Sequence, residues 1–317
     1  MNAERLTKNE RREQAREQAR LARVEEQKRE KRRRLYWQGG IVLGALAVLA
    51  VVALVLVQSM KPAGPGPENM ASGGVVFEKD LKIVASPGLA EGGERVAPAT
   101  DRENKVDLSI YVDYACNHCQ AFESQYGAVL ENWVGSGDAT LEIYPVNILG
   151  PSGSSYSTKA ANAVACLVDQ TPEPGIAFSM HNSLLSDTTY KRAMESGGLS
   201  DNDFADLATK AGFSVNNEYR QCLKDIRFAG FVSQNTKVAS ETSGVLGLAE
   251  GAVLVDQQGQ NGQVTYQKEG QPQRLRGTPL VVVNGKEWRS DRDGEFGLYL
   301  AKVKAELPGG TTSDSGK

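Results

Sequence analysis

Two cysteines three residues apart, Cys116 and Cys119, stand in the segment YVDYACNHCQAF together with His118, one of the chain's two histidines. Thiol–disulfide exchange uses such a pair, because one thiolate attacks a disulfide and a second thiol displaces it. The attacking thiol needs a low pKa, which the first turn of a helix supplies through free N–H groups and a positive dipole end. We therefore predict Cys116 as the nucleophile, Cys119 as the resolving thiol, and His118 as a neighbour that favours the Cys116 thiolate.

Two other roles for this cysteine pair remain open at this point. A structural zinc site needs four ligands, usually supplied as two close pairs. The remaining cysteines, Cys166 and Cys222, are far apart in the sequence and form no second close pair. A purely structural disulfide between Cys116 and Cys119 would close too short a loop to stabilise the fold much.

The elements around the pair are expected to form a strand, a helix and a second strand. VDLSIYVDY, residues 106–114, alternates apolar and polar residues as a strand does. After the cysteines, apolar side chains recur at steps of four, four and three and so form one helix face; they are Phe122, Tyr126, Leu130 and Trp133. Residues 139–149 read as the next strand. The cysteine pair therefore falls where the first strand passes into the helix.

A helical block over about residues 155–245 is expected to follow. Its helices are predicted at 157–170, 175–186, 200–212 and 216–244, the last with a break near 226–228. Residues 251–270 read as an extra hairpin, because two short strand-like runs flank a Gly/Asn turn.

The C-terminal part of this region predicts a hairpin and a closing helix. Leu280–Val283 and Lys286–Trp288 read as strands around an Asn284–Gly285 turn, which is the type I′ signature. An amphipathic helix is expected at 294–307.

With these elements in place, the chain resembles the thioredoxin-fold disulfide oxidoreductases of the DsbA type, in a membrane-anchored bacterial branch. The motifs that carry the resemblance are YVDYACNHCQAF and, about 160 residues later, GTPLVVVNG before a hairpin. The resemblance implies an α/β, thioredoxin-like fold with an inserted helical domain. The chain departs from the family pattern at two positions. Asn117 stands where many relatives have Pro, and Ile110 stands where thioredoxin has an acidic residue.

The resemblance also implies further site residues and partners. Thr278 and Pro279 are expected to join through a cis peptide that faces the cysteines and binds an extended substrate segment. A quinone-linked membrane partner is expected to reoxidise the pair, and no metal or organic cofactor is expected.

The N-terminal sequence predicts a single transmembrane helix over residues 36–58. From Leu35 to Met60 no residue is charged, and the 19-residue run 39–57 spans roughly 30 Å as a helix, about one hydrocarbon core. The preceding arm, residues 1–35, holds KREKRRR, so the arm is expected in the cytoplasm and the rest of the chain outside it. One alternative is that this N-terminal sequence is a cleaved signal peptide. Another is that the charged arm binds nucleic acid.

The remaining boundaries follow from composition. Residues 59–73 are rich in Pro, Gly and polar residues and are expected to be a linker, and residues 308–317 a disordered tail. Residues 74–307 are then the DsbA-like domain, outside the cell membrane, where thiols tend to be oxidised.

In that compartment we predict a structural disulfide between Cys166 and Cys222. Each lies in a predicted helix with apolar neighbours, and relatives of this branch carry cysteines at comparable places. The alternative is a pair of buried free thiols.

The sequence thus predicts an extracytoplasmic thiol–disulfide oxidoreductase that acts in oxidative protein folding on secreted or cell-envelope proteins with cysteines. Two alternatives remain. The first is a disulfide reductase or isomerase on the same fold. The second is a non-catalytic, membrane-tethered scaffold domain in which the cysteine pair is merely closed.

Overall fold

The structure is a computed structural model. It describes residues 28–29, 65–97, 100, 102–150, 153, 155–259 and 262–308. The chain divides into two compact units, residues 1–61 and 62–317, and residues 28–29 of the first unit are helical. Among the helices in the described ranges, none is long and apolar enough to span a bilayer. The membrane helix expected at 36–58 falls outside those ranges.

A six-stranded mixed sheet forms the centre of the second unit. Its strands lie in the order β2 (Lys82–Ile83), β1 (Val75–Glu78), β4 (Ala139–Pro145), β3 (Val106–Val112), β7 (Leu280–Val283) and β8 (Lys286–Glu287). β3 and β4 are parallel, whereas β1 and β7 run antiparallel to their neighbours. Parallel strands need a long crossover, and here it is the helix α2 (Asn117–Ser136).

The predicted strand–helix–strand unit is present, with shorter strands than expected. β3 is buried along nearly its whole length, as a central strand covered on both faces is. α2 buries Phe122, Tyr126 and Leu130, and Trp133 packs partly buried against the core. The helix ends at Gly137, whose φ of 86° is the left-handed conformation that glycine adopts without a Cβ penalty.

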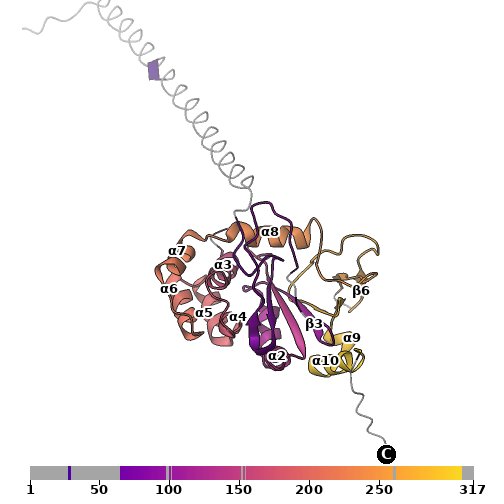
Figure 1. The fold of residues 1–317 in the computed structure, drawn as a ribbon. Helices are drawn as coiled ribbons and strands as arrows, with labels where there is room; N and C mark the ends of the chain where they lie inside the picture. Colours follow the sequence, from indigo (N-terminus) through magenta and orange to yellow (C-terminus); the bar gives the residue numbers. More distant parts are fainter. Residues whose placement is uncertain are drawn as a thin grey trace, which may run out of the picture. The chain divides into compact units, whose positions relative to one another are not determined.

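In the described residues between β4 and β7, six helices follow one another. They are α3 (Tyr156–Val168), α4 (Ile176–Leu185), α5 (Asp187–Ser196), α6 (Asp201–Lys210), α7 (Asn217–Asp225) and α8 (Ala229–Ser240). Figure 1 shows α3 to α7 gathered on one side of the sheet. The break expected near 226–228 is confirmed, because Ile226 leaves the helix at a φ of 46°. α5 was not expected; its start is marked by Ser186, whose side chain accepts the Thr189 N–H.

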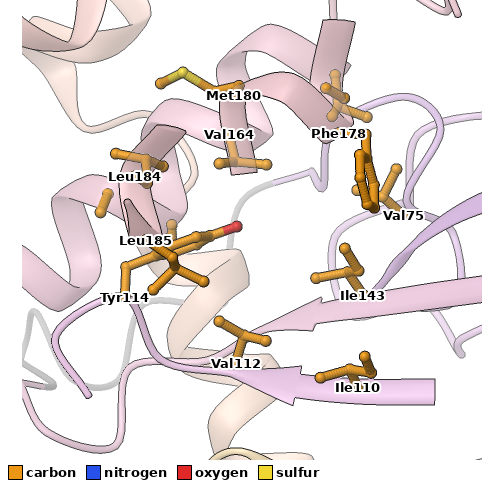
Figure 2. Close-up of a cluster of buried hydrophobic side chains, with 14 of the residues drawn as sticks. Val75, Ile110, Val112, Tyr114, Ile143, Val164, Phe178, Met180, Leu184 and Leu185 are labelled. Carbon is orange, nitrogen blue, oxygen red and sulfur yellow. The ribbon is translucent and has the colours of Figure 1, made fainter. Parts of the chain in front are cut away.

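The main core lies between the sheet and these helices. Figure 2 shows Ile110 and Val112 of β3 and Ile143 of β4 facing Phe178 and Leu185 of α4. All five side chains are buried. The inserted helices are thus part of the same hydrophobic core as the sheet. Cys119, in the first turn of α2, belongs to this core as well.

The expected extra hairpin forms a separate two-stranded sheet, β5 (Val255–Gln258) and β6 (Val264–Tyr266). It lies on the opposite side of the sheet from α5 and α6 (Figure 1). The closing helix α10 (Phe296–Ala305) follows a short helix, α9 (Ser290–Asp293).

The expected linker at 59–73 needs a correction in its second half. Residues 69–74 are buried, and Met70 is only 1% exposed within the main core. The backbone N–H of Gly66 donates to Leu89 O, and that of Asn69 donates to Ser86 O. Pro/Gly content alone predicted flexibility, but one large apolar side chain and these backbone hydrogen bonds attach the segment to the domain.

Candidate active site

The cysteine pair lies where β3 passes into α2, as the sequence predicted. Cys116 is the N-cap residue of α2, with an extended backbone, and Cys119 lies in its first turn. Cys116 is 5% exposed and Cys119 only 1% exposed. Both sulfurs are free thiols, so the structure represents the dithiol form of the pair.

The loop that carries Cys116 is held in shape by the buried carboxyl of Asp113. That carboxyl accepts hydrogen bonds from the backbone N–H of Ala115 and of Leu149, both at 2.9 Å. It also accepts one from the Ser157 hydroxyl at 2.7 Å. Asp113 thereby joins the cysteine loop, the loop after β4 and the start of α3, which fixes where Cys116 enters the helix.

The two thiols have opposite acid–base behaviour. The pKa of Cys116 is lowered to about 5, mainly because Cys119 donates a hydrogen bond to its sulfur. Thr278 and the backbone N–H groups of Cys119 and His118 add to the effect, and burial opposes it. The pKa of Cys119 is raised well above the ordinary value, chiefly by burial and then by the Cys116 sulfur. One sulfur is therefore a thiolate at neutral pH while its neighbour keeps its proton.

His118 contributes to this asymmetry through its backbone. Its side chain is exposed, and within the described part of the chain no group is hydrogen-bonded to its imidazole. The N–H groups of the first helical turn act directly on the Cys116 sulfur, as expected for an anion at a helix start. Tuning by the imidazole itself stays a prediction.

The Thr278–Pro279 peptide lies against the nucleophile. This peptide bond is cis, and the Cys116 sulfur lies 3.1 Å from the carbonyl oxygen of Thr278, to which it donates a hydrogen bond in its protonated form. Leu280, the next residue, pairs with Tyr111 of β3, so the sheet register brings together residues 162 positions apart. The structure thus places both expected substrate-binding residues beside Cys116.

Cys166 and Cys222 form a disulfide that joins α3 to α7. Their Cα atoms are 6.0 Å apart, and both residues are fully buried. These two sulfurs are therefore not available as the second pair of ligands that a zinc site would need. Within the described residues no cluster of three or more metal-binding side chains occurs.

One contact to the cysteine loop was missed in the sequence. The hydroxyl of Tyr190, on α5, donates to the carbonyl oxygen of Ala115 at 3.1 Å. The pKa of Tyr190 is raised, first by burial and then by the two cysteines, which shows how close it lies to them. No spacing rule links residue 190 to residue 115, so only the fold reveals this contact.

Comparison with known proteins places this geometry in a family. A family model described as Thioredoxin matches residues 100–248. Among solved structures, DsbA of Mycobacterium tuberculosis in its oxidised form is 19% identical with a TM-score of 0.48, and the match covers 74% of this chain and 92% of that one. BdbD of Bacillus subtilis is 16% identical with a TM-score of 0.45, covering 78% and 98%. No curated protein matches the chain.

A third similar structure is the MdbA protein of Actinomyces oris, a thiol–disulfide oxidoreductase. It is 18% identical with a TM-score of 0.44, and the match covers 66% of this chain and 83% of that one.

The class that the fold and the cysteine pair define is that of the thioredoxin-fold thiol–disulfide oxidoreductases. Residues 100–248 match the Thioredoxin family model, which agrees with the resemblance expected from the motifs. Cys116 and Cys119 lie at the helix start, where thiol–disulfide exchange needs them.

Proposed function

We propose that this chain is an oxidase, anchored in the cell membrane with its N-terminus in the cytoplasm, that introduces disulfides into secreted or cell-envelope proteins outside the cytoplasm. The observation that carries the proposal is the pairing of a Cys116 thiol whose pKa is about 5 with a Cys119 thiol whose pKa is well above normal. A thiolate of low pKa is a good leaving group, and its stability favours the reduced form of the pair. Such an enzyme readily gives its disulfide away.

The reaction starts from the disulfide form of the pair. A substrate thiolate attacks the Cys116 sulfur, the Cys116–Cys119 bond breaks, and its electron pair leaves on Cys119, which takes up a proton. A second substrate thiolate then attacks the substrate sulfur of the mixed disulfide and displaces Cys116 as a thiolate. The substrate loses two electrons and gains one disulfide, while the enzyme becomes the dithiol.

The dithiol must then be reoxidised for a further turnover. A quinone-linked membrane protein with its own disulfide fits this role, since it would accept two electrons by the same exchange steps. The buried Cys166–Cys222 disulfide supports an oxidising compartment, because such bonds are rare in the cytosol. The uncharged run after KREKRRR supports an anchor.

A groove beside the cis-peptide loop is a suitable substrate site. It has a volume of about 290 Å³ and is lined by residues 254–258, residues 274–280, Glu287 and Arg289. One wall is therefore the segment that contacts Cys116, and the other is the extra hairpin. An extended substrate segment that enters this groove would pass Thr278 with its cysteine next to the nucleophile.

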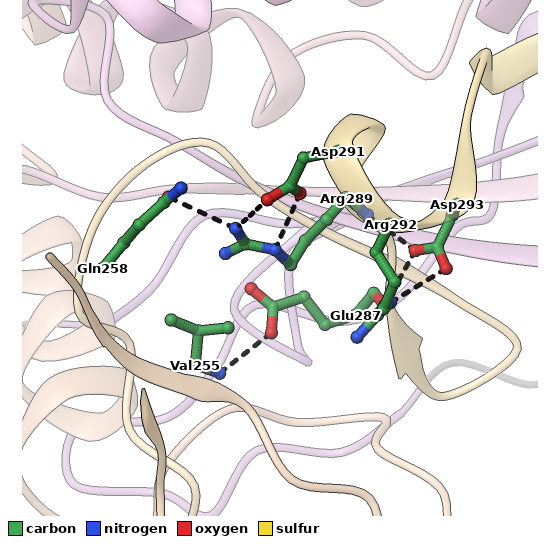
Figure 3. Close-up of polar contacts among 7 residues, drawn as sticks. All are labelled: Val255, Gln258, Glu287, Arg289, Asp291, Arg292 and Asp293. Carbon is green, nitrogen blue, oxygen red and sulfur yellow. Dashed lines mark hydrogen bonds and ion pairs between the residues drawn. The ribbon is translucent and has the colours of Figure 1, made fainter. Parts of the chain in front are cut away.

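Polar contacts join the hairpin to β8 and to the residue Arg289 that follows this strand. The N–H of Val255 donates to Glu287 Oε2 at 2.9 Å, and Arg289 donates to Gln258 Oε1 at 3.2 Å (Figure 3). Arg276, from the opposite wall, pairs with Asp256 at 2.8 Å. These contacts hold the hairpin as one wall of the groove.

Shortening the hairpin should therefore change substrate choice without unfolding the domain. We expect that replacing residues 257–266 by Asn-Gly, which keeps the buried Leu254 and Leu275, leaves the melting temperature nearly unchanged. Oxidation of a reduced, unfolded protein should slow several-fold, because it needs the groove, while exchange with glutathione should not change. Equal rates of the shortened and full-length chains on the unfolded protein would show that the hairpin takes no part in binding.

Trapping of mixed disulfides tests the proposed function. With Cys119→Ala, a complex formed at Cys116 has no resolving thiol and should persist on non-reducing gels from the producing cells. Cys116→Ala is the matched control, and it should trap nothing.

The trapped partners also report on location. They should be secreted or envelope proteins with cysteines, and the complexes should sediment with membranes. A complete absence of complexes would support the scaffold alternative, and a set made only of cytosolic proteins would contradict the proposed location.

A further inference from the structure

The wall of the groove that leads to Thr278 is an extended segment in which burial alternates. Gln273 and Leu275 are 7% and 3% exposed, whereas Arg274 and Arg276 are exposed. Successive side chains of an extended segment point to opposite sides. Gln273 and Leu275 therefore point into the domain, and both arginines point away from it and line the groove.

The backbone around Arg274 is fixed by hydrogen bonds. The Leu275 N–H donates to Ala239 O at 2.9 Å. The side-chain amide of Gln267 binds both backbone groups of Arg274, because its Oε1 accepts the Arg274 N–H at 2.7 Å and its Nε2 donates to Arg274 O at 2.6 Å. A backbone that is already ordered loses little conformational freedom when a ligand binds. The Arg274 side chain thus starts from a fixed position on the groove wall.

The guanidinium of Arg274 differs from those of the other arginines that line the groove. Arg276 Nε lies 2.8 Å from Asp256 Oδ1, and Arg289 Nη2 lies 2.7 Å from Asp291 Oδ2, a pair shown in Figure 3. Within the described ranges, the Arg274 side chain has neither an ion pair nor a hydrogen bond. A guanidinium presents a planar fork of N–H donors that matches a carboxylate. Arg274 is therefore the groove arginine that is ready to bind an acidic group.

A second pocket adjoins the groove and adds a further cation. This outer pocket has a volume of about 450 Å³, shares Asp256, Arg274 and Arg276 with the groove, and is also lined by Lys268. Lys268 has no ion pair to any residue that the structure describes. Positive charge exceeds negative charge among the side chains that line the groove and the outer pocket: Lys268, Arg274, Arg276 and Arg289 against Asp256 and Glu287.

We propose that Arg274, assisted by Lys268, selects substrate segments that carry an acidic side chain a few residues from the reacting cysteine. This inference rests on the proposed function and names the substrate class that its groove prefers. Arg274 and Lys268 determine specificity and take no part in the exchange of disulfides, which proceeds at Cys116 and Cys119 as described above.

The position of the acidic residue follows from the length of the groove wall. Arg274 stands four residues before Thr278, whose carbonyl oxygen lies 3.1 Å from the Cys116 sulfur. Four extended residues span at most about 14 Å, so an extended substrate whose cysteine lies at Cys116 reaches Arg274 with a residue about four positions away. A glutamate there is attracted by the unpaired cations and a lysine is repelled, so both effects contribute to the choice of substrate.

The test compares short peptides that differ in one charge. The oxidised full-length protein is mixed with a non-saturating excess of a peptide that contains two cysteines, and loss of the Cys116–Cys119 disulfide is followed by mass spectrometry after an acid quench. The peptides carry Glu, Gln or Lys about four residues before the cysteines in one set and after them in the other. Each rate is divided by the rate of the same peptide with hydroxyethyl disulfide, an uncharged small molecule, which removes the effect of the charge on the thiols.

The native protein should prefer the acidic peptide in one of the two sets. At low salt we expect the Glu peptide to react about fivefold faster than the Lys peptide, with Gln between them, as for a partly exposed ion pair. High salt should reduce this preference, because it screens the charges. Arg274→Glu should reverse the order of the peptides, and Arg274→Gln should make their rates nearly equal. The backbone bonds to Gln267 remain in both variants, so their melting temperatures should be close to that of the native protein.

Matched controls distinguish a local effect from a change in net charge. Arg220→Glu makes the same change of charge at an exposed position of α7, and it should keep the native preference. Dithiothreitol is uncharged and too small to reach Arg274 from the cysteines. It should therefore reduce the disulfide at the same rate in the native protein and in Arg274→Glu.

The other outcomes would overturn the inference. Equal rates of the Glu and Lys peptides in both sets, or an Arg274→Glu variant that slows all peptides alike, would leave Arg274 without a role in selection. Binding to vesicles with anionic lipid that is lost in Arg274→Glu, without any peptide preference, would assign these cations to a membrane surface instead. If Arg274→Glu does not fold, Arg274→Gln and the salt dependence of the native protein decide. If neither dithiothreitol nor any peptide opens the Cys116–Cys119 disulfide, the proposed function itself fails.

Discussion

The reduced protein should lose its reactivity towards iodoacetamide only below a midpoint near pH 5, and at pH 6 it should react roughly tenfold faster than a free thiol. The midpoint follows from the pKa of Cys116, which is about 5, against about 8.5 for an ordinary cysteine. The thiolate fraction at pH 6 is several hundred times that of a free thiol, but a thiolate of low pKa is also less nucleophilic, which reduces the gain. Mass spectrometry of protein alkylated at a series of pH values gives the midpoint.

Two variants show which contact lowers the pKa. Cys119→Ala removes the largest contribution and should raise the midpoint clearly. His118→Ala removes only an exposed side chain, because the backbone N–H of residue 118 remains, so its midpoint should move less. If the native midpoint lies near 8.5, the account of Cys116 as an activated nucleophile is wrong.

The same pKa makes the stability of the reduced protein depend on pH. A thiol whose pKa is lower in the folded state binds fewer protons there, so the free energy of unfolding rises with pH between about 5 and 8.5. The rise amounts to as much as about 5 kcal/mol, at 1.36 kcal/mol per pKa unit. It is lost as the pH falls through 5. The disulfide form has no Cys116 thiol and should not show this slope.

Removal of the Cys166–Cys222 disulfide should lower the free energy of unfolding by about 4 kcal/mol. The bond closes a loop of 56 residues, and in the chain-entropy model such a crosslink restricts the unfolded chain strongly. Cys166→Ala with Cys222→Ala is the suitable pair, because both sites are fully buried and a serine hydroxyl there would add a desolvation cost. Urea unfolding of the oxidised protein and of the double variant gives the difference.

The redox chemistry of Cys116 provides the control for that double variant. The disulfide joins α3 to α7 and does not involve the cysteine loop. The alkylation midpoint of Cys116 should therefore be unchanged. A double variant as stable as the native protein, or two free thiols at 166 and 222 in the non-reduced native protein, would contradict the structural role of this disulfide.

Local patterns predicted the elements that hold the cysteine pair. The apolar stripe of α2, the break at Ile226 and the turn at Asn284–Gly285 each depend on residues close in the sequence, and the structure contains all three. Thr278 was placed beside Cys116 through the family resemblance, because spacing alone cannot show that residues 162 apart meet.

Two of the features that sequence reasoning missed depend on contacts between distant elements. His181, on α4, bridges Tyr114 and Glu123 from two other segments. Residues 69–73 have the composition of a linker, yet Met70 enters the core. In both cases the side chain is buried against residues far away in the sequence. The local spacing of apolar residues does not indicate such a contact.

The reduction potential of the Cys116–Cys119 pair, measured by equilibration with reduced and oxidised glutathione, tests the central claim most directly. The hydrogen bonds that stabilise the Cys116 thiolate stabilise the dithiol form and so make the disulfide a strong oxidant. We expect a potential above about −180 mV, in the range between disulfide isomerases and strong oxidases. A potential near −270 mV, as in reducing thioredoxins, would contradict the oxidase and identify the chain as a reductase on the same fold.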